Sequence, residues 1–567
     1  MRASLSYFII FCCAGLTACS PASDSQETPA PAITVDPLVE HVEQVLTEVY
    51  SDELPGATVV ISQKGDLIVE TARGMADMEL DVALQPHHIL RLASVTKQYT
   101  AATILKLVEQ GKLALDAPVG DVLPNFHVPE ITIHQLLNHT SGLPSYTDVP
   151  GYVTGDDMRA DLSTAEIIAL TSDLPLEFTP GSQWRYNNSA YVVLGAVIEE
   201  VTGNSWHEAM QELLFEPLGL GTTGYYSAAE ITPGRVEGYM QQEQLVNAPF
   251  ISMTQPHAAG ALSATAADVD KWQRALHGGK VLSDALYSRM IDTSQGLQNY
   301  AYGLSVTSLR GEQMISHSGG IHGFNTYALW LPEQEVSVVV LSNYAGHTPA
   351  VGEVALRLAS QVIGKPFPIE KATIELPASE LQALVGTYQI SDDEQRSLSL
   401  NDGVLYSQRD GGRKLAVAAV GNDQFVLEDS LVYFEALRNE AGQVTGLNFY
   451  QIATTEPEYA EKISDKAPQR SVINLSDSQA QRLVGNYELM PGFVISIRHT
   501  EAGMVAQATG QSAFVVQAES PSVLFNDEFG IVMEFELPEQ GPASQLMLLQ
   551  GGQKSPAPRM QDQKEGE

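Results

Sequence analysis

The last third of the sequence contains an internal repeat, and this repeat limits the folds open to the chain. Leu384-Val385-Gly386-Thr387-Tyr388 returns 99 residues later as Leu483-Val484-Gly485-Asn486-Tyr487. Each copy follows a polar, helix-like lead and precedes a stretch of short alternating strands with turns. Such a repeat predicts two similar β units rather than one continuous core. The alternative is a single large β domain with a chance match of five residues.

The repeat and its flanks define the expected domains of the second half. Pro366, Pro368 and Pro377 mark a linker at 366–378, where the character of the sequence changes. We expect two small antiparallel β-barrels, joined by a polar linker and followed by a disordered polar tail. The expected bounds are 379–455 for the first barrel, 456–475 for the linker, 476–552 for the second barrel and 553–567 for the tail.

The residues before the repeat show a mixed pattern. Apolar residues recur at helical spacing from Leu38 to Tyr50, and two β-rich runs follow at 57–63 and 67–74. Several helical patterns come next, and strand patterns return between Tyr302 and Asn343. This order predicts an α+β domain at 37–365, with an antiparallel sheet that is flanked by helices and takes strands from both ends.

The first residues have the pattern of an export signal. Arg2 precedes an apolar run that is too short to span a membrane and that ends in Leu16-Thr17-Ala18-Cys19. This ending resembles the bacterial lipobox, in which the cysteine becomes lipidated. We expect a signal peptide at 1–18, a lipid anchor on Cys19 and a flexible tether at 19–36. The expected location is the periplasmic face of a Gram-negative outer membrane, and an ordinary signal peptide is the alternative.

The net charge of −38 argues against one class of partner and leaves others open. Nucleic-acid phosphates would be repelled rather than neutralised, so we expect no nucleic-acid binding. The histidines and acidic residues show no metal-ligand spacing such as His-Glu-x-x-His. We therefore expect neither a metal nor a cofactor.

Ser94-Val95-Thr96-Lys97 brings two functional groups together at the predicted start of a helix. A spacing of three residues places both side chains on one helix face, with Ser94 at the positive end of the helix dipole. A lysine acts as a base only when it is unprotonated, and burial lowers its pKa. The sequence has no other lysine with a serine three positions before it. Ser94 is thus a candidate nucleophile and Lys97 its base, although helices often expose such pairs.

Two further motifs supply candidates for proton transfer and substrate binding. Tyr186-Asn187-Asn188 is the only Tyr-x-Asn in the chain, and a tyrosine near a lysine can relay a proton. His317-Ser318-Gly319-Gly320 lies between two predicted strands, where glycines let backbone N–H groups approach a ligand. Taken singly, Tyr186 would be a loop tyrosine packed on Trp184, and His317 would be a structural histidine.

The three motifs occur once each and in this order, and together they carry a resemblance. With the stretches 92–97, 137–143 and 259–263, they are similar to the superfamily of class C β-lactamases, DD-peptidases and family VIII esterases, over roughly Leu38 to Gly364. The resemblance implies a serine hydrolase that forms an acyl-enzyme, with an oxyanion hole made by the N–H groups of Ser94 and Gly320. It implies catalysis by Ser94, Lys97 and Tyr186 and substrate contacts from Asn188, His317, Ser318, Gly319 and Gly320.

His317 departs from the pattern of the β-lactamases, which usually carry lysine at this place. A largely neutral histidine is less suited to receive the carboxylate of a β-lactam. The histidine is similar to that of the superfamily's peptidases, D-aminopeptidases and esterases. A catalytic domain followed by two lipocalin-like barrels resembles the D-aminopeptidases. We therefore expect a peptidase or amidase, such as an aminopeptidase or carboxypeptidase specific for D-amino acids, or an esterase. The expected substrate is a small peptide, amide or ester. The alternatives are a β-lactamase, a penicillin-binding sensor that is acylated without turnover, and a ligand-binding barrel protein with a vestigial hydrolase.

Overall fold

The structure is a computed structural model that describes residues 37–560 apart from short gaps. The gaps are residues 295, 368–372, 393, 411, 429, 469, 491–492, 502, 510 and 551–552. The predicted signal peptide, lipid anchor on Cys19 and tether lie outside the described residues and stay predictions. Within the described ranges, no helix has both the length and the apolar character needed to cross a membrane.

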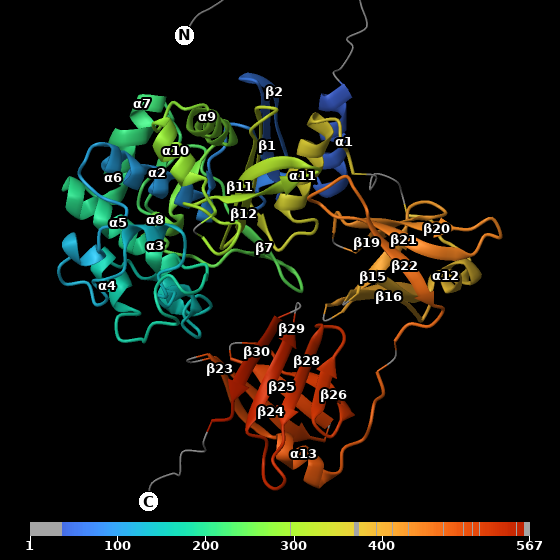
Figure 1. Cartoon of the computed structure of the whole chain (residues 1–567). Helices are drawn as coiled ribbons and strands as arrows, with labels where there is room; N and C mark the ends of the chain where they lie inside the picture. Colours follow the sequence, from blue (N-terminus) through green and yellow to red (C-terminus); the bar gives the residue numbers. More distant parts are fainter. Residues whose placement is uncertain are drawn as a thin grey trace, which may run out of the picture.

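The first domain is built on a six-stranded antiparallel sheet in the order β10-β11-β12-β13-β1-β2 (Figure 1). β1 (Ala57–Gln63) pairs with β13 (Val336–Ser342), so the two ends of the domain meet inside the sheet. This arrangement confirms the predicted α+β fold. The other strands are β2 (Asp66–Arg73), β10 (Ser305–Leu309), β11 (Glu312–Ile321) and β12 (Phe324–Leu331).

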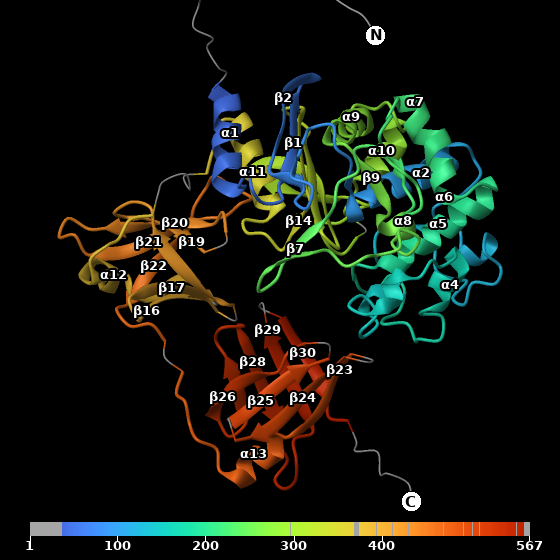
Figure 2. The same cartoon turned by 180° about the vertical axis from the view of Figure 1, so that it is seen from behind.

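Helices cover both faces of this sheet, and alternate side chains of β13 pack against the two sets of helices. Val338 and Val340 pack with α1 (Pro37–Val49) and α11 (Val351–Val362), which lie together on one face (Figure 2). Val339 belongs to the core beneath the helices on the other face. Since successive residues of a strand point to opposite faces, a strand that is buried on both sides needs a continuous apolar run.

The chain between β2 and β10 forms the half of the domain that holds the candidate site. Its helices are α2 (Thr96–Glu109), α3 (Ile133–Leu137), α4 (Thr164–Ala169), α5 (Asn188–Thr202), α6 (Trp206–Met210), α7 (Glu216–Leu218), α8 (His257–Gly260), α9 (Ala266–His277) and α10 (Asp284–Met290). Its 3-10 turns are η1 (Ala93–Val95), η2 (Val119–Asp121), η3 (Tyr146–Asp148) and η4 (Asp156–Arg159), and a π-helical turn (Gln211–Phe215) separates α6 from α7. Short strands complete the domain: β3 (Met75–Asp77), β4 (Val82–Ala83), β5 (Leu90–Arg91), β6 (Gly224–Tyr225), β7 (Tyr239–Gln241), β8 (Leu245–Asn247), β9 (Leu262–Ala264) and β14 (Tyr344–Ala345).

Two eight-stranded antiparallel barrels follow, one closed and one nearly closed. The first consists of α12 (Ala378–Leu384), β15 (Gly386–Ser391), β16 (Glu394–Asn401), β17 (Val404–Arg409), β18 (Lys414–Ala419), β19 (Gln424–Leu427), β20 (Tyr433–Arg438), β21 (Val444–Tyr450) and β22 (Glu458–Ser464). The second consists of α13 (Asp477–Leu483), β23 (Gly485–Met490), β24 (Phe493–Thr500), β25 (Gly503–Ala508), β26 (Phe514–Ser520), β27 (Val523–Asn526), β28 (Ile531–Glu536), β29 (Gln545–Gln550) and β30 (Gln553–Pro558).

The repeated five residues occupy the same place in both barrels. The hydroxyl of Tyr388 donates a hydrogen bond to the carbonyl of Leu384 (2.5 Å), and the hydroxyl of Tyr487 donates to the carbonyl of Leu483 (2.8 Å). Both tyrosines are fully buried, each in the separate hydrophobic core of its own barrel. The repeat is therefore a structural signature, and the prediction of two barrels is confirmed.

Two of the expected boundaries are wrong. The linker expected at 456–475 contains β22, which pairs with β15 and closes the first barrel. Ala460 is the only buried residue of β22, so its sequence has almost no hydrophobic alternation. The tail expected at 553–567 begins with β30, which pairs with β29. β30 contains two prolines, which are tolerated because it is the last strand of its sheet.

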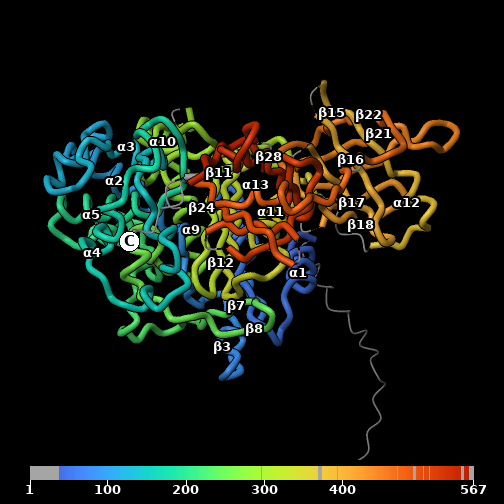
Figure 3. The backbone as a smooth tube through the Cα atoms, turned by 90° about the horizontal axis from the view of Figure 1, so that it is seen from below, coloured from blue at the N-terminus to red at the C-terminus, as the bar shows by residue number. Residues whose placement is uncertain are grey.

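The two barrels are attached to the first domain in different ways. The backbone N–H groups of Arg310 and Gly311 donate to the carbonyls of Ile452 (2.9 Å) and Ala453 (2.8 Å). Tyr433 of the first barrel also joins the core formed by α1 and α11. The second barrel lies beneath the first domain, at the end of an extended segment. Seen from below, it lies across the sheet half of that domain rather than across α4 and α5 (Figure 3).

Candidate active site

Ser94 lies in η1, between β5 and α2. The preceding Leu92 is fixed by Thr326, whose hydroxyl donates to the Leu92 carbonyl (2.9 Å). Ala93 has a φ of +48°, a left-handed conformation that is costly for a residue with a Cβ atom. The turn places Ser94 on the wall of a cavity of about 110 Å³, which Gly320 also lines.

Lys97, in the first turn of α2, is fully buried. Its Nζ lies 3.1 Å from Ser94 Oγ, 2.8 Å from Asn188 Oδ1 and 2.8 Å from the Ala259 carbonyl oxygen. Burial lowers the pKa of Lys97 well below its usual 10.5. A buried amine with a lowered pKa and an adjacent hydroxyl has the properties of a general base.

The partners of Lys97 determine how an unprotonated amine would be oriented. The Ala259 carbonyl can only accept a hydrogen bond. Asn188 also presents its oxygen to the lysine, because its Nδ2 donates to Thr147 Oγ1 (3.0 Å). A neutral amine has two N–H bonds, and these two acceptors use both of them. Its lone pair then faces the hydroxyl of Ser94, so that the amine can accept the hydroxyl proton.

Asn188 is held at the start of α5 by contacts that no sequence motif indicated. Asn187 caps the helix, since its side chain accepts from the N–H of Ala190 (2.7 Å). The backbone N–H of Asn188 donates to Ser145 Oγ (3.2 Å), beside the contact with Thr147. Ser145 and Thr147 follow closely the stretch 137–143 that resembled the family, and this proximity is the only sequence signal for them.

Tyr186 lies against the lysine and the serine. Lys97 Nζ is 4.8 Å from the centre of its ring, and His139 packs on that ring with a centroid distance of 4.5 Å. Burial raises the pKa of Tyr186, and the nearby Ser94 hydroxyl opposes this increase only in part. The buried phenol oxygen makes no hydrogen bond of normal geometry to the described residues. Tyr186 is therefore a neutral phenol next to Ser94, available to give or receive a proton.

His317 is placed differently from the other predicted residues. Its Nδ1 lies 2.6 Å from the Ser318 carbonyl, which can only accept, so Nδ1 carries the proton. Its Nε2 therefore accepts from the hydroxyl of Tyr300, 2.8 Å away. Burial lowers the pKa of His317 to about 3, so the ring is neutral. In this arrangement neither ring nitrogen is free for a substrate, and the ring lies behind the cavity, 6.3 Å from that of Tyr186 between centroids.

The remaining residues of this motif form an edge next to Ser94. β10 pairs with β11 only as far as Ser316, so residues 317–321 have a free edge. Gly319 is required there, because a Cβ would lie 2.4 Å from the Leu92 carbonyl oxygen. Gly320 lines the cavity, whereas the Ser318 side chain is exposed. Among the described residues, no three His, Cys, Asp or Glu side chains gather as metal ligands.

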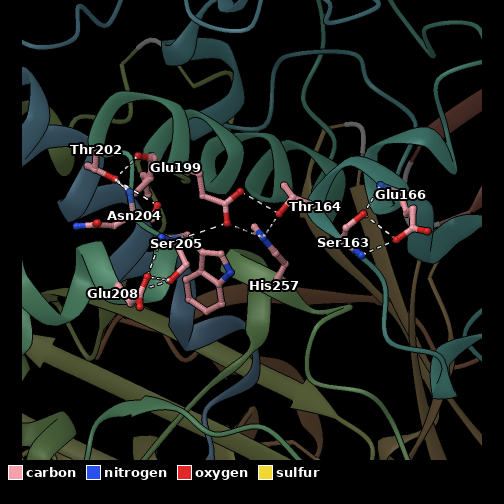
Figure 4. Close-up of polar contacts among 11 residues, drawn as sticks. Ser163, Thr164, Glu166, Glu199, Thr202, Asn204, Ser205, Glu208 and His257 are labelled. Atoms are coloured by element: carbon pink, nitrogen blue, oxygen red, sulfur yellow. Dashed lines mark hydrogen bonds and ion pairs between the residues drawn. The ribbon is translucent and has the colours of Figure 1, made fainter.

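α8 supplies the Ala259 carbonyl, and a partly buried polar network, none of whose residues lines the Ser94 cavity, anchors this helix (Figure 4). Thr164 Oγ1 donates to Glu199 Oε2 (2.9 Å) and accepts from His257 Nε2 (3.0 Å), which also lies 3.7 Å from Glu199 Oε1. Gly195 of α5 makes room for this histidine, since a Cβ there would lie 2.5 Å from the imidazole. Nothing in the sequence singled these residues out.

Residues 35–362 match the family model described as Beta-lactamase, which covers more than half of the chain. The chain belongs to the beta-lactamase family. The matched residues contain all three motifs and every strand of the six-stranded sheet. The family includes serine hydrolases of several kinds, so membership supports a hydrolase and leaves the substrate open.

Two curated relatives and two solved structures illustrate this range. The chain is similar to a D-aminopeptidase of Gluconobacter oxydans (25% identity over 346 residues, 59% of this chain and 63% of the relative). It is also similar to esterase EstB of Burkholderia gladioli (40% over 190 residues, 31% and 48%), so the matches span less than two thirds of either relative. An octameric penicillin-binding protein homologue of Pyrococcus abyssi has the same fold (TM-score 0.54, 24% identity, 75% of this chain and 99% of that one). A D-stereospecific amidohydrolase of Streptomyces sp. has a TM-score of 0.50 and 27% identity (56% and 98%).

The substitution Gly195→Ala tests whether α8 positions the lysine. The added methyl group would push His257 and α8 away from α5 and move the Ala259 carbonyl that orients Lys97. We expect the rate at which Ser94 reacts with a fluorophosphonate to fall about 10- to 100-fold, because small displacements of reacting groups are costly. The control is Gly221→Ala, where a Cβ has no neighbour within 4 Å. Equal labelling rates in the two variants would contradict this role of α8.

The lowered pKa of Lys97 has a consequence for stability. Between the pKa of the folded protein and the ordinary value of 10.5, the unfolded chain binds one proton more at this position, so raising the pH stabilises the fold. Lys97→Met should remove this contribution, which amounts to about 1.4 kcal/mol per pH unit inside that window. The measurement is the free energy of urea unfolding at several alkaline pH values, with the exposed Lys112→Met as control. Parallel curves for the wild type and Lys97→Met would refute the shift.

Proposed function

We propose that the chain is an acyl-serine hydrolase in which Ser94 is the nucleophile and Lys97 the base. The observation that supports this most strongly is the buried Lys97 amine, whose lone pair can face Ser94 Oγ at 3.1 Å. Lys97 takes the hydroxyl proton as Ser94 attacks the substrate carbonyl. The carbonyl oxygen, which becomes negative, is stabilised by the backbone N–H groups of Ser94 and Gly320.

Tyr186 completes the proton path in this proposal. Its neutral phenol lies beside both Ser94 and Lys97, so it can pass a proton to the departing amine or alcohol. Loss of that group leaves an ester between Ser94 and the acyl part of the substrate. A water molecule then attacks this ester, and Lys97 with Tyr186 moves protons in the reverse direction.

The substrate class that fits best is a small amide, peptide or ester. The two curated relatives are named as an aminopeptidase for D-amino acids and an esterase. The neutral, buried His317 supports the same choice, because it offers no positive charge to the carboxylate of a β-lactam. Within this class, we infer that D-amino-acid amides and short peptides with a D-residue are substrates.

Mass spectrometry of the full chain tests the reaction and its substrate together. We expect an acyl adduct on Ser94 and steady turnover of D-alanine amide or p-nitrophenyl acetate. Ser94→Ala should abolish both the adduct and the turnover while keeping the fold, because the attacking oxygen is lost. Turnover of nitrocefin alone would favour a β-lactamase, and a burst of acylation without release would favour a penicillin-binding sensor. Undiminished activity of Ser94→Ala would remove Ser94 from the mechanism.

We also propose that the hydrolase is attached to a membrane through a lipid on Cys19, at the periplasmic face of the outer membrane. The lipobox-like residues 16–19 and the polar segment that follows them support this location. Cys19→Ser should abolish incorporation of labelled palmitate and move the protein from the membrane fraction to the soluble fraction. Equal labelling of Cys19→Ser and the wild-type chain would contradict the anchor.

A further inference from the structure

A second cavity, of about 220 Å³, lies next to the one that contains Ser94. His322 lines both cavities, which therefore adjoin at this residue. Two arginines, Arg91 and Arg235, line the second cavity, and Tyr226 and Phe324 form part of its wall. We call this the arginine cavity.

Backbone contacts hold the two arginines side by side. Arg91 ends β5 and pairs with Ser263 on β9. The segment that carries Arg235 is bound to Ile89, just before β5. The N–H of Ile89 donates to the Gly234 carbonyl (2.8 Å), and the N–H of Val236 donates to the Ile89 carbonyl (3.3 Å). The arginine cavity is therefore a built feature of the fold and does not depend on a flexible loop.

Neither arginine forms a close ion pair within the described structure, although Glu237 also lines the cavity. Neither Arg91 nor Arg235 has a carboxylate of the described residues within ion-pair distance. Arg91 lies over the ring of Phe324, 5.4 Å from its centre, and Arg235 donates to the Ser227 carbonyl (3.3 Å). Most other arginines of this domain do have such a partner: Arg73, Arg185, Arg274, Arg289 and Arg357.

Two adjacent cations in a chain with a net charge of −38 require an explanation. Burial and the nearby Arg235 lower the pKa of Arg91 to about 10, while Glu237 opposes this. Arg91 is still protonated at neutral pH, and the repulsion between the two guanidinium groups is relieved when an anion binds between them. A guanidinium group presents paired N–H donors that match the two oxygens of a carboxylate.

The position of the cavity links it to the reaction. Arg91 precedes Ser94 by three residues, so their backbones are separated by at most about 10 Å. Because the two cavities also adjoin at His322, a small substrate that reacts at Ser94 can place another of its groups near Arg91. Arg91 ends β5 and Ser94 lies in the turn that joins β5 to α2, which fixes the positions of the two backbones relative to each other.

We propose that the arginine cavity binds a carboxylate group of the substrate, so that amides or esters with a free carboxylate are hydrolysed in preference to neutral ones. This inference rests on the proposed function of Ser94. It places the recognition of negative charge at Arg91 and Arg235, and His317 has no part in it. Short peptides with a free terminal carboxylate are substrates of this class.

Two matched pairs of esters test the proposal with the full chain. The first pair is 3-acetoxybenzoate and 3-acetoxybenzamide, which give the same acetyl-enzyme and differ only in the charge of the leaving group. The second pair is the 4-nitrophenyl monoester of isophthalic acid and its carboxamide, which differ only in the charge of the acyl group. We expect kcat/KM to favour the anionic member of at least one pair about tenfold or more. This preference should weaken with increasing salt.

Substitution of the arginines shows whether they cause the preference. Arg235→Gln and Arg91→Met should each reduce the anionic-to-neutral ratio of kcat/KM toward one. The control Arg498→Gln removes the same charge from the exposed surface of the second barrel and should keep the ratio. Equal use of both members of both pairs by the wild type, or an unchanged ratio in both variants, would overturn the proposal. Failure of the proposed function is a different result, because then neither member of either pair is hydrolysed through Ser94.

Discussion

The buried amine of Lys97 is the interaction on which the rest of the active domain depends. An ammonium group without water is unfavourable, and a neutral amine still needs acceptors for its N–H bonds. Those acceptors come from two elements that are distant in sequence, Asn188 of α5 and Ala259 of α8. α2, α5 and α8 must therefore all be in place before Ser94 has a base. The polar network of Glu199 and His257, and the space left by Gly195, serve this placement.

The central part of the site could be predicted from the sequence because its chemistry allows few residue types. Three motifs that are far apart in the chain meet at one cavity. They are the serine three positions before a lysine, the Tyr-x-Asn motif and the glycine-rich edge of β11. The position of His317 could not be predicted, since its tautomer depends on Tyr300 and on a backbone carbonyl.

The features that could not be predicted from the sequence depend on contacts between distant residues or on strands without a hydrophobic pattern. Two of these contacts form only when the chain has folded: the one between His257 and Glu199, and the pairing of the segments that carry Arg91 and Arg235. No local spacing in the sequence predicts them. The strands β22 and β30 were missed because one buries a single alanine and the other contains prolines. The barrels themselves could be predicted, because each repeats the same buried tyrosine and its carbonyl partner.

The packing of Tyr433 into the core of α1 and α11 determines where the chain can be divided without exposing apolar surface. The first barrel covers apolar surface of the first domain through Tyr433 and its neighbours, although it also has a hydrophobic core of its own. The second barrel has a hydrophobic core that includes no residue of the first domain, and an extended segment joins it to the first barrel. A cut after the first barrel therefore removes no residue from this shared core, whereas a cut before it exposes apolar residues of α1 and α11.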